Sequence, residues 1–403
     1  MASDHLGERL SRLRRLADLT QEGLAQRSGV SPDVIRKLEQ QRKHSARLPT
    51  LHSLARGLGV ELTALLGDPP AVPSSGDAEP PQLVAVRRAI MPPLFAPPVE
   101  PSGAEGLSLP LLRAELAEGW TLYHAAEFGR LMEALPGIIA DARLVAAVGN
   151  PEQRAAGQAA LGKALQLGGH LAIRLGKTDL ALSALERAFA AAGDSSDPLL
   201  APMVSNSVAW AYQRQARLDD ATNLAVHAAD GVEREHANTS EGVRVWGALL
   251  MSAATSYARS DDYETANDMM VTAATAAKRL TKLPPPVDGK LVSVFSTSSV
   301  RIERVRLAVQ HERPEEALKL AKGMRLSADT PPSWRTWLLL DVARAHTDMG
   351  DAVGAITALN KLREIAPGWM RHHTLAVAIV TDLWAGPSRP PGLRKLVKFL
   401  GVA

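Results

Sequence analysis

Beyond residue 110, apolar and small residues recur at the three- and four-residue spacing of helices, with no strand-like alternation. Helix–turn–helix units repeat there, and each has an alanine at the same place after its turn. These anchor alanines are Ala181, Ala221, Ala266, Ala317 and Ala355. Twelve positions before the alanine, four of the five units have another small residue, as closely crossing helices require. The pattern predicts a stack of helical hairpins.

The first 67 residues predict a separate small domain of five short helices. Two of them, over residues 20–39, share an apolar core, and Gly29 lies in the turn between them, where a positive φ is easily accommodated. Ser31 is placed to cap the second helix, and Pro32 fits its first position, where a missing N–H is tolerated. The expected core residues are Leu24, Ala25, Val30, Ile35 and Leu38.

Prolines separate these two regions. Eleven of the 27 prolines lie between residues 68 and 110, and such density disfavours helix and favours an extended spacer. We therefore expect a domain at 1–67, a proline-rich linker at 68–110 and a helical domain at 111–403. Three apolar stretches of the linker are predicted to dock on a neighbouring surface, residues 83–86, 90–91 and 94–95.

Composition favours an all-α fold. Of the 403 residues, 46% are hydrophobic but only 4% are aromatic, a mixture that suits alanine- and leucine-rich helices better than sheets. The absence of cysteine excludes disulfides, cysteine-ligated zinc and thiol catalysis. No apolar run is long enough to span a membrane, and the N-terminus resembles no secretion signal, so a cytoplasmic location is expected.

Positive charge is concentrated in the N-terminal domain. Residues 1–70 contain eleven Lys and Arg against eight Asp and Glu, and this excess of three equals the net charge of +3 of the whole chain. A basic head on a balanced body indicates a polyanionic partner for the head.

Motifs spread over residues 6–67 are in register with one family. They are Thr20-Gln21-Glu22, Leu24-Ala25, Gly29-Val30-Ser31, Ile35, Leu38-Glu39, Leu54-Ala55 and Leu58-Gly59-Val60. Together they resemble the Xre/Cro-type helix-turn-helix of phage and bacterial repressors. The resemblance implies that the helix over residues 31–40 enters the major groove of DNA and that Gln21 binds a phosphate. It also implies a structural ion pair between Arg14 and Glu39, outside the binding set.

The predicted DNA-binding residues are Gln21, Ser31, Asp33, Arg36, Lys37, Gln40, Arg42 and Lys43. Asp33, Arg36, Lys37 and Gln40 share one helix face by their spacing. The family often has Gln or Arg where Pro32 and Asp33 stand, so base readout is assigned to Arg36 and Lys37, which suit guanine. Arg42 and Lys43 lie in a basic stretch suited to the DNA backbone. A merely solvated charged face is the alternative.

The repeated positions beyond residue 110 resemble the tetratricopeptide repeat, although the anchor alanines are more widely spaced than its 34 residues. In that register, eleven inward-facing residues form a predicted effector or partner groove. They are Lys163, Gln166, His170, Arg174, Asn206, Trp210, Arg214, Thr255, Arg259, Arg306 and Arg344. The amides suit a peptide backbone and the arginines suit carboxylates. Alternatively, Arg174, Arg214 and Arg259 only follow the preference of cations for helix C-termini.

A repressor-type head on a tetratricopeptide body resembles the RRNPP group of peptide-sensing regulators. The resemblance implies a homodimeric, sequence-specific transcriptional regulator that binds an inverted-repeat operator in double-stranded DNA in the cytoplasm, at the nucleoid. Its repeats would sense a peptide, a small anionic effector or a protein partner. The alternative is an interaction scaffold whose head only tethers it to DNA. No catalytic or phosphate-binding motif occurs, so no enzyme activity, metal, cofactor or membrane partner is expected.

Overall fold

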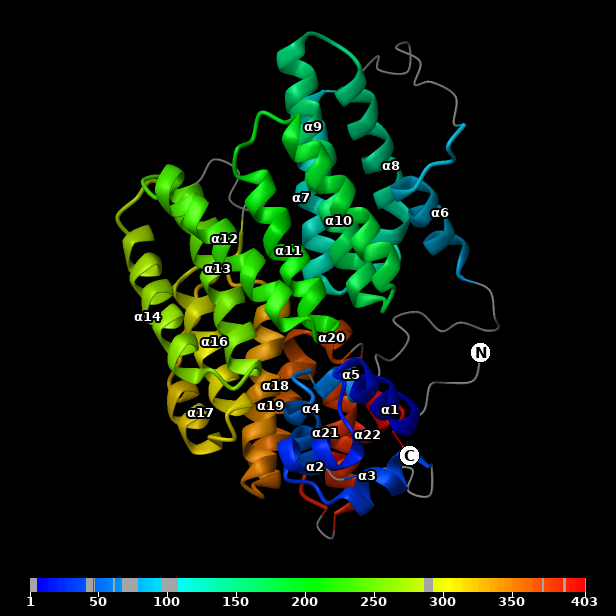
Figure 1. Cartoon of the computed structure of the whole chain (residues 1–403), viewed down its shortest axis with the longest axis vertical. Helices are drawn as coiled ribbons and strands as arrows, with labels where there is room; N and C mark the ends of the chain where they lie inside the picture. The colour runs from blue at the N-terminus through cyan, green and yellow to red at the C-terminus, as the bar shows by residue number, and fades with distance from the viewer. Residues whose placement is uncertain are drawn as a thin grey trace.

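The all-α fold predicted from the sequence is confirmed (Figure 1). A computed structural model describes residues 6–40, 46, 48–60, 62–66, 79–95, 108–285, 293–371, 373–386 and 389–402. Within these ranges every regular element is a helix, and no strand occurs. None of the described helices combines the length and the apolar character needed to cross a bilayer.

The N-terminal head consists of α1 (Leu6–Leu16), α2 (Gln21–Ser28), α3 (Pro32–Glu39), α4 (Leu48–Gly57) and α5 (Leu62–Leu66). The turn between α2 and α3 follows the expectation. Gly29 has a φ of 71°, Ser31 Oγ accepts a hydrogen bond from the Val34 amide at 3.4 Å, and Pro32 opens α3. The predicted core residues Leu24, Ile35 and Leu38 are fully buried, whereas Ala25 and Val30 are half-buried.

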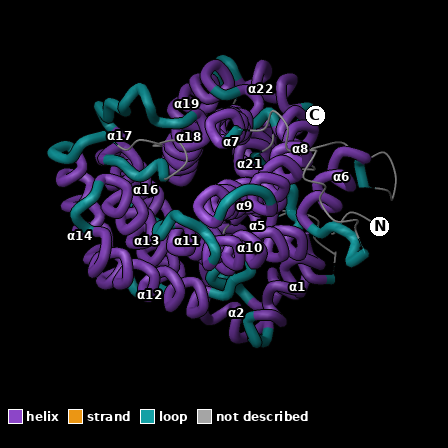
Figure 2. The backbone as a smooth tube through the Cα atoms, turned by 90° about the horizontal axis from the view of Figure 1, so that it is seen from above, coloured by secondary structure: helices purple, strands orange, loops and turns teal. Residues whose placement is uncertain are grey.

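Six helical hairpins follow within the described residues. Their first helices are α7 (Leu109–Ala125), α9 (Pro151–Arg174), α11 (Leu200–Arg214), α13 (Ser240–Arg259), α16 (Thr297–Gln310) and α18 (Pro332–Asp348). Their second helices are α8 (Phe128–Ala147), α10 (Thr178–Gly193), α12 (Leu218–His236), α14 (Tyr263–Leu280), α17 (Pro314–Ala321) and α19 (Ala352–Ile365). Seen from above, the first helices form an inner ring and most second helices lie outside it (Figure 2).

The anchor alanines lie where the helices of a hairpin cross. All five are at most 1% exposed. Gly169, twelve residues before Ala181, shows why the crossing requires small residues, because a Cβ there would lie 2.7 Å from Leu185 Cδ2. The tetratricopeptide-like register predicted from the sequence therefore describes the packing of these hairpins.

The stack closes on itself through the C-terminal helices α20 (Pro367–Arg371), α21 (Thr374–Ala385) and α22 (Leu393–Leu400). The indole Nε1 of Trp369 donates to the carbonyl of His124, on α7, at 2.7 Å, and the ring lies edge-on to Phe128. The same His124 makes a hydrogen bond of 2.8 Å through Nδ1 to Ser333 Oγ, on α18. The first and last hairpins are thus joined, and the solenoid becomes a ring.

The head docks at one end of this ring. Its helices α4 and α5 pack against α21, and buried residues of the head and of the C-terminal helices belong to one continuous hydrophobic cluster. In Figure 1 the head lies beside α21 and α22, below α9 and α10, with α3 turned away from the ring.

Part of the predicted linker is a helix, which corrects the expectation that its prolines keep it extended. Helix α6 spans Pro81–Ile90 and packs against α8 through the buried residues Leu83, Val86 and Ile90. Proline is tolerated at a helix start because its missing N–H would have no partner there. Of the residues expected to dock, Leu83, Val86 and Ile90 are buried and Met91 packs against the same cluster, whereas Ala85 is exposed and Leu94 and Phe95 are 97% and 96% exposed.

Candidate functional site

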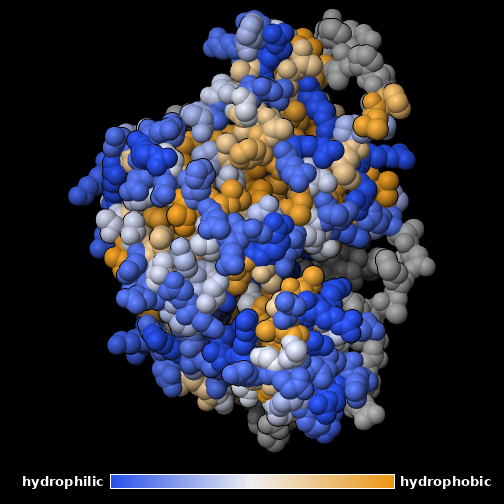
Figure 3. Space-filling view, viewed as in Figure 1, coloured by the Kyte–Doolittle hydropathy of each residue, from blue (hydrophilic) through white to orange (hydrophobic). Residues whose placement is uncertain are grey.

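The outer face of α3 is the first candidate surface. Ile35 and Leu38 are fully buried, while the predicted DNA-binding residues Asp33, Arg36, Lys37 and Gln40 are exposed on the other side of the helix. Lys37 Nζ lies 2.7 Å from Asp33 Oδ2, and the hydrogen bond from Lys37 lowers the pKa of the Asp33 carboxyl. The surface of this part of the head is mostly hydrophilic (Figure 3).

Gln21 belongs to an ion-pair cluster beneath that face. Arg14 forms two parallel bonds with Glu39, Nε to Oε1 at 2.7 Å and Nη2 to Oε2 at 2.9 Å, which confirms the ion pair implied by the resemblance. Gln21 Nε2 donates to Glu39 Oε2 at 2.7 Å. Gln21, predicted to bind a phosphate, therefore uses its amide nitrogen to hold α2 to α3 in this structure.

The remaining predicted DNA-binding residues divide into two groups. Ser31 is exposed at the start of α3, where its hydroxyl oxygen serves as the helix cap. Arg42 and Lys43 lie outside the described residues.

The second candidate site is a cavity of about 360 Å³ enclosed by the inner ring. Ten of the eleven residues of the predicted groove line it. Lys163 does not, because its Nζ lies 2.8 Å from Asp197 Oδ2 and the side chain is taken up by that ion pair. A volume of this size lies within the usual range of small-molecule sites.

Aromatic rings surround one part of the cavity. The guanidinium of Arg174 lies over Trp369 at 4.7 Å and over Trp210 and Trp337 at 5.4 Å. Arg174 is therefore held by cation–π contacts with three indole rings. His170 Nε2 lies 2.9 Å from Ser207 Oγ. Burial, with contributions from His124 and Arg174, lowers the pKa of His170 to about 3. This histidine is therefore neutral at physiological pH.

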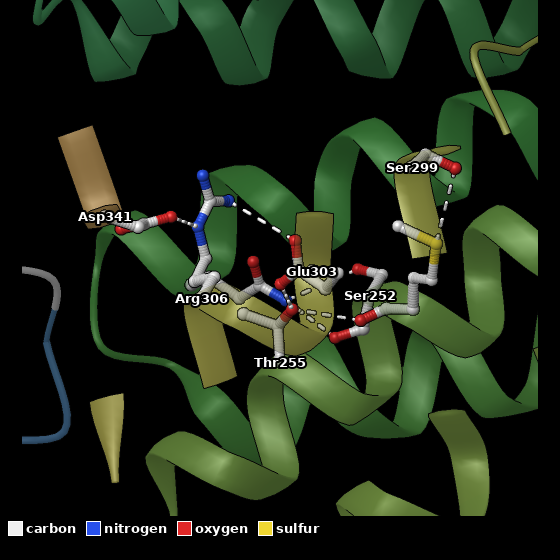
Figure 4. A network of polar contacts seen from close by, with 8 residues as sticks. Ser252, Thr255, Ser299, Glu303, Arg306 and Asp341 are labelled. Atoms are coloured by element: carbon white, nitrogen blue, oxygen red, sulfur yellow. Dashed lines mark hydrogen bonds and ion pairs between the residues drawn. The ribbon is translucent and has the colours of Figure 1, made fainter. Parts of the chain in front are cut away.

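Charged and hydroxyl groups line another part of the cavity (Figure 4). Arg306 lies 3.5 Å from both Glu303 and Asp341, and Thr255 Oγ1 donates to Glu303 Oε1 at 2.9 Å. Burial raises the pKa of Asp341 to about 6 despite the nearby guanidinium of Arg306. In the same lining Arg344, 3% exposed, pairs with Asp348 at 3.2 Å.

Several buried polar atoms of the lining have no hydrogen-bond partner among the described residues. They include Asn206 Oδ1, Gln310 Oε1 and Arg344 Nη2. A buried polar atom left without a partner is destabilising by about 1–3 kcal/mol. In total the lining has six arginines against two acidic residues. Both features suit a polar ligand with an anionic group.

The head itself forms part of the cavity wall. His52, Arg56 and Gly59, from α4 and the turn after it, line the same space as the ring residues. Arg259 donates from Nε and Nη2 to the Gly59 carbonyl at 3.1 and 2.7 Å. Arg56 Nε lies 3.4 Å from Glu312 Oε1. Burial, with Arg344 and Arg56, lowers the pKa of His52 to about 2, so this contact residue is neutral.

The sequence did not place these head residues at the cavity, nor Trp120 and Tyr123 of α7. The anchor-alanine pattern begins with the second hairpin, so it assigns no inward positions on α7. The head contacts join residues 200 apart in sequence, and no local pattern indicates such a pairing.

Comparison with known protein families gives a match for the head. Residues 5–66 match a family of helix-turn-helix domains. No curated protein matches the chain. BtubC (BKLC) from P. vanneervenii is similar at 17% identity and a TM-score of 0.41, over 65% of this chain and 96% of that one. A Rap protein solved in complex with Competence and Sporulation Factor is similar at 12% identity and a TM-score of 0.45, over 73% of this chain and 87% of that one.

These matches differ in weight. Both solved structures are less than 20% identical to this chain and have TM-scores below 0.5. The description of the ring therefore depends on the helices of this chain and on their packing. The assignment of the head as a helix-turn-helix domain depends on the family match and on the geometry of α2 and α3. The protein thus joins an N-terminal helix-turn-helix domain to a tetratricopeptide-like helical ring.

Proposed function

We propose that the protein is a homodimeric transcriptional regulator that reads an operator through its head and receives an effector in its ring. The observation that carries this proposal is the position of the head. One of its surfaces presents α3 to solvent, and another forms part of the cavity wall. A DNA-reading helix and a ligand-sized cavity therefore meet in one small domain.

The lining of the cavity supports a peptide or a small anionic effector. The amide groups of Asn206 and Gln310 suit a peptide backbone, since their oxygens lie buried without partners among the described residues. The excess of arginines suits a carboxylate. The rings of Trp210 and Trp337 suit apolar side chains. A protruding segment of a partner protein would meet the same groups.

Dimerisation follows from the size of the head. A single helix-turn-helix buries little surface, so specific binding requires two heads on half-sites about one helical turn apart. The arrangement predicts an inverted-repeat operator, with the ring domain holding the two copies together. The expected location is the cytoplasm, at the nucleoid, and no catalytic role is proposed.

Selection of binding sites from random double-stranded DNA by the full chain tests the proposal. A reproducible inverted repeat is expected. On the selected site, Lys37→Ala and Arg36→Ala should each weaken binding by about 1–3 kcal/mol and relax base preference, because they remove donors to base edges. Arg187→Ala, an exposed arginine of α10, is the matched control and should leave binding unchanged.

Arg42→Ala separates backbone contacts from base contacts. It should weaken binding to the selected site and to random DNA alike and lower the salt dependence by about one unit, since a phosphate contact carries no base information.

An interaction scaffold with a DNA tether is the second candidate, because the ring could equally seat a partner protein. Salt-sensitive binding without any preferred sequence would favour that scaffold over the regulator.

A further inference from the structure

One buried arginine at the seam between head and ring bonds both sides. Arg259 is 8% exposed at the end of α13, and two of its N–H groups converge on the Gly59 carbonyl. Its Nη2 also donates to the Gln213 carbonyl at 2.8 Å, which fixes the guanidinium between α11 and α13. Arg259 thus joins the head to the middle of the ring, next to the ion pair of Arg56 with Glu312.

Gly59 fits closely into the ring. Its φ of 67° is left-handed, and a Cβ at this position would lie 3.0 Å from Leu218 Cδ1 and 3.6 Å from the Arg259 carbonyl. The turn between α4 and α5 therefore sits between the start of α12 and the end of α13. On its other side the head is held by the apolar contacts of α4 and α5 with α21.

Arg259 faces the cavity as well as the head. Both Arg259 and Gly59 belong to the lining, among six arginines and two acids. The bonds from the guanidinium to the Gly59 carbonyl are already charge-assisted, but a carboxylate adds ion-pair attraction and can accept two parallel N–H bonds from the same guanidinium. An anion in the cavity therefore competes with the neutral Gly59 carbonyl for the same donors. Once Arg259 turns away, the Gly59 carbonyl has to accept hydrogen bonds from water instead. Water can reach it only if the head moves away from the ring.

We propose that Arg259 is a ligand-operated latch, which holds the head on the ring through Gly59 and releases it when an anionic group of a ligand takes its guanidinium. The released head pivots about its contact with α21, which changes the direction in which α3 points. The inference rests on the proposed function in taking the cavity as the effector site. It adds the residue that senses the ligand, the ligand chemistry and the movement that follows.

The absence of cysteine allows a direct test on the full chain. Spin labels are attached at Gln26→Cys on α2 and Glu186→Cys on α10, both exposed, and the distance distribution between them is measured without DNA. The labelled chain with Arg259 unchanged should give one narrow distribution of distances. Arg259→Met should raise the population at other distances about 10-fold or more, because the two bonds to Gly59 are lost.

Two variants keep the test decisive. Arg279→Met removes an exposed arginine of α14 that bonds Asn238, and should reproduce the narrow distribution. Arg259→Lys keeps the charge but loses the forked donors, and should give an intermediate population. Helix content by circular dichroism verifies that each variant is folded. If Arg259→Met gives the narrow distribution of the unmodified latch, Arg259 is not the latch.

Citrate at constant ionic strength serves as the anionic probe. It should raise the released population in the chain with Arg259 and leave the Arg259→Met distribution unchanged. If the Arg259→Met variant shows the released distances but citrate has no effect on the chain with Arg259, the proposed competition for Arg259 is wrong. Because no DNA is present, failure of the latch is distinguishable from failure of the proposed regulator, which the operator selection tests alone.

Discussion

Two half-buried histidines lie together in the aromatic part of the cavity. His124 and His170 each bond a serine hydroxyl, and burial together with Arg174 lowers their pKa values to about 4 and about 3. Because the folded pKa lies below the unfolded value of about 6.5, these groups stabilise the fold above pH 6.5. Their contribution is lost as the pH falls toward 4.

This sign gives a prediction for the variant His124→Gln/His170→Gln. Between pH 6.5 and 4.5 its free energy of unfolding should fall less than that of the unchanged protein, by up to about 1.4 kcal/mol per pH unit for each histidine. Denaturant unfolding at each pH measures the difference. Asp341, whose raised pKa of about 6 acts in the opposite direction, is common to both chains and cancels.

The control for that series is His227→Gln, an exposed histidine of α12. It should track the unchanged protein at every pH. Equal slopes for all three chains would show that His124 and His170 have no part in the pH dependence.

At this scale the sequence predicts positions better than roles. The repeat register places His170 and Gln166 on the inner face, and both line the cavity. It does not reveal that Gln166 Nε2 donates to Ser207 Oγ at 2.9 Å and so joins α9 to α11. Such a bond depends on how two hairpins are spaced, which is set by packing across the whole stack rather than by local pattern.

Among the elements, α6 is the one that the sequence pattern misses. Its surroundings are rich in proline, but Pro80 and Pro81 stand at its start, and the apolar spacing of Leu83, Val86 and Ile90 then has the period of a helix. Arg87 joins the helix to α10 through Asp179 at 3.0 Å and also pairs with Glu79, just before α6, at 2.9 Å. Counting prolines without regard to their position in the helix conceals this element.

Ile90→Ala should therefore destabilise the ring domain by about 2–4 kcal/mol, because Ile90 is fully buried at the end of α6 against Gly168. Chemical denaturation of the full chain provides the measurement. Leu94→Ala is the matched control, since Leu94 is 97% exposed, and it should change the free energy of unfolding by less than about 0.5 kcal/mol. A similar loss in both variants would mean that α6 does not hold its place through Ile90.

In the whole molecule, ring closure depends on Trp369. The indole is 1% exposed and contacts α7 through its hydrogen bond to the His124 carbonyl. Trp369→Ala should remove about 3–5 kcal/mol of stability and raise amide hydrogen exchange in α7 and α18 together, because α20 contacts α18 and its Trp369 bonds the His124 carbonyl of α7. Trp384→Ala, at a half-buried position of α21, should leave exchange in α7 unchanged.

The sequence predicts a stack of hairpins and a separate head, but neither the ring nor the docking. Trp369 meets His124 across 245 positions and Arg259 meets Gly59 across 200. Helical period, turn residues and anchor alanines are all read within one hairpin and have no information on such pairs. The register does place Arg259 inward. What it meets there is Gly59, which belongs to a motif of the head that indicates a family but not a partner within the chain.

The packing of the head on α21 also has a consequence for synthesis. At about 5–20 residues per second, the ribosome needs tens of seconds to pass from α5 to α21. During that interval the nascent chain has a folded head but not the helix that holds it. A chain truncated within the ring would keep a head that no ligand of the cavity could reach, but it would lack the domain that we propose holds two copies together. Early stop codons in the ring should therefore behave as loss-of-function alleles rather than dominant ones.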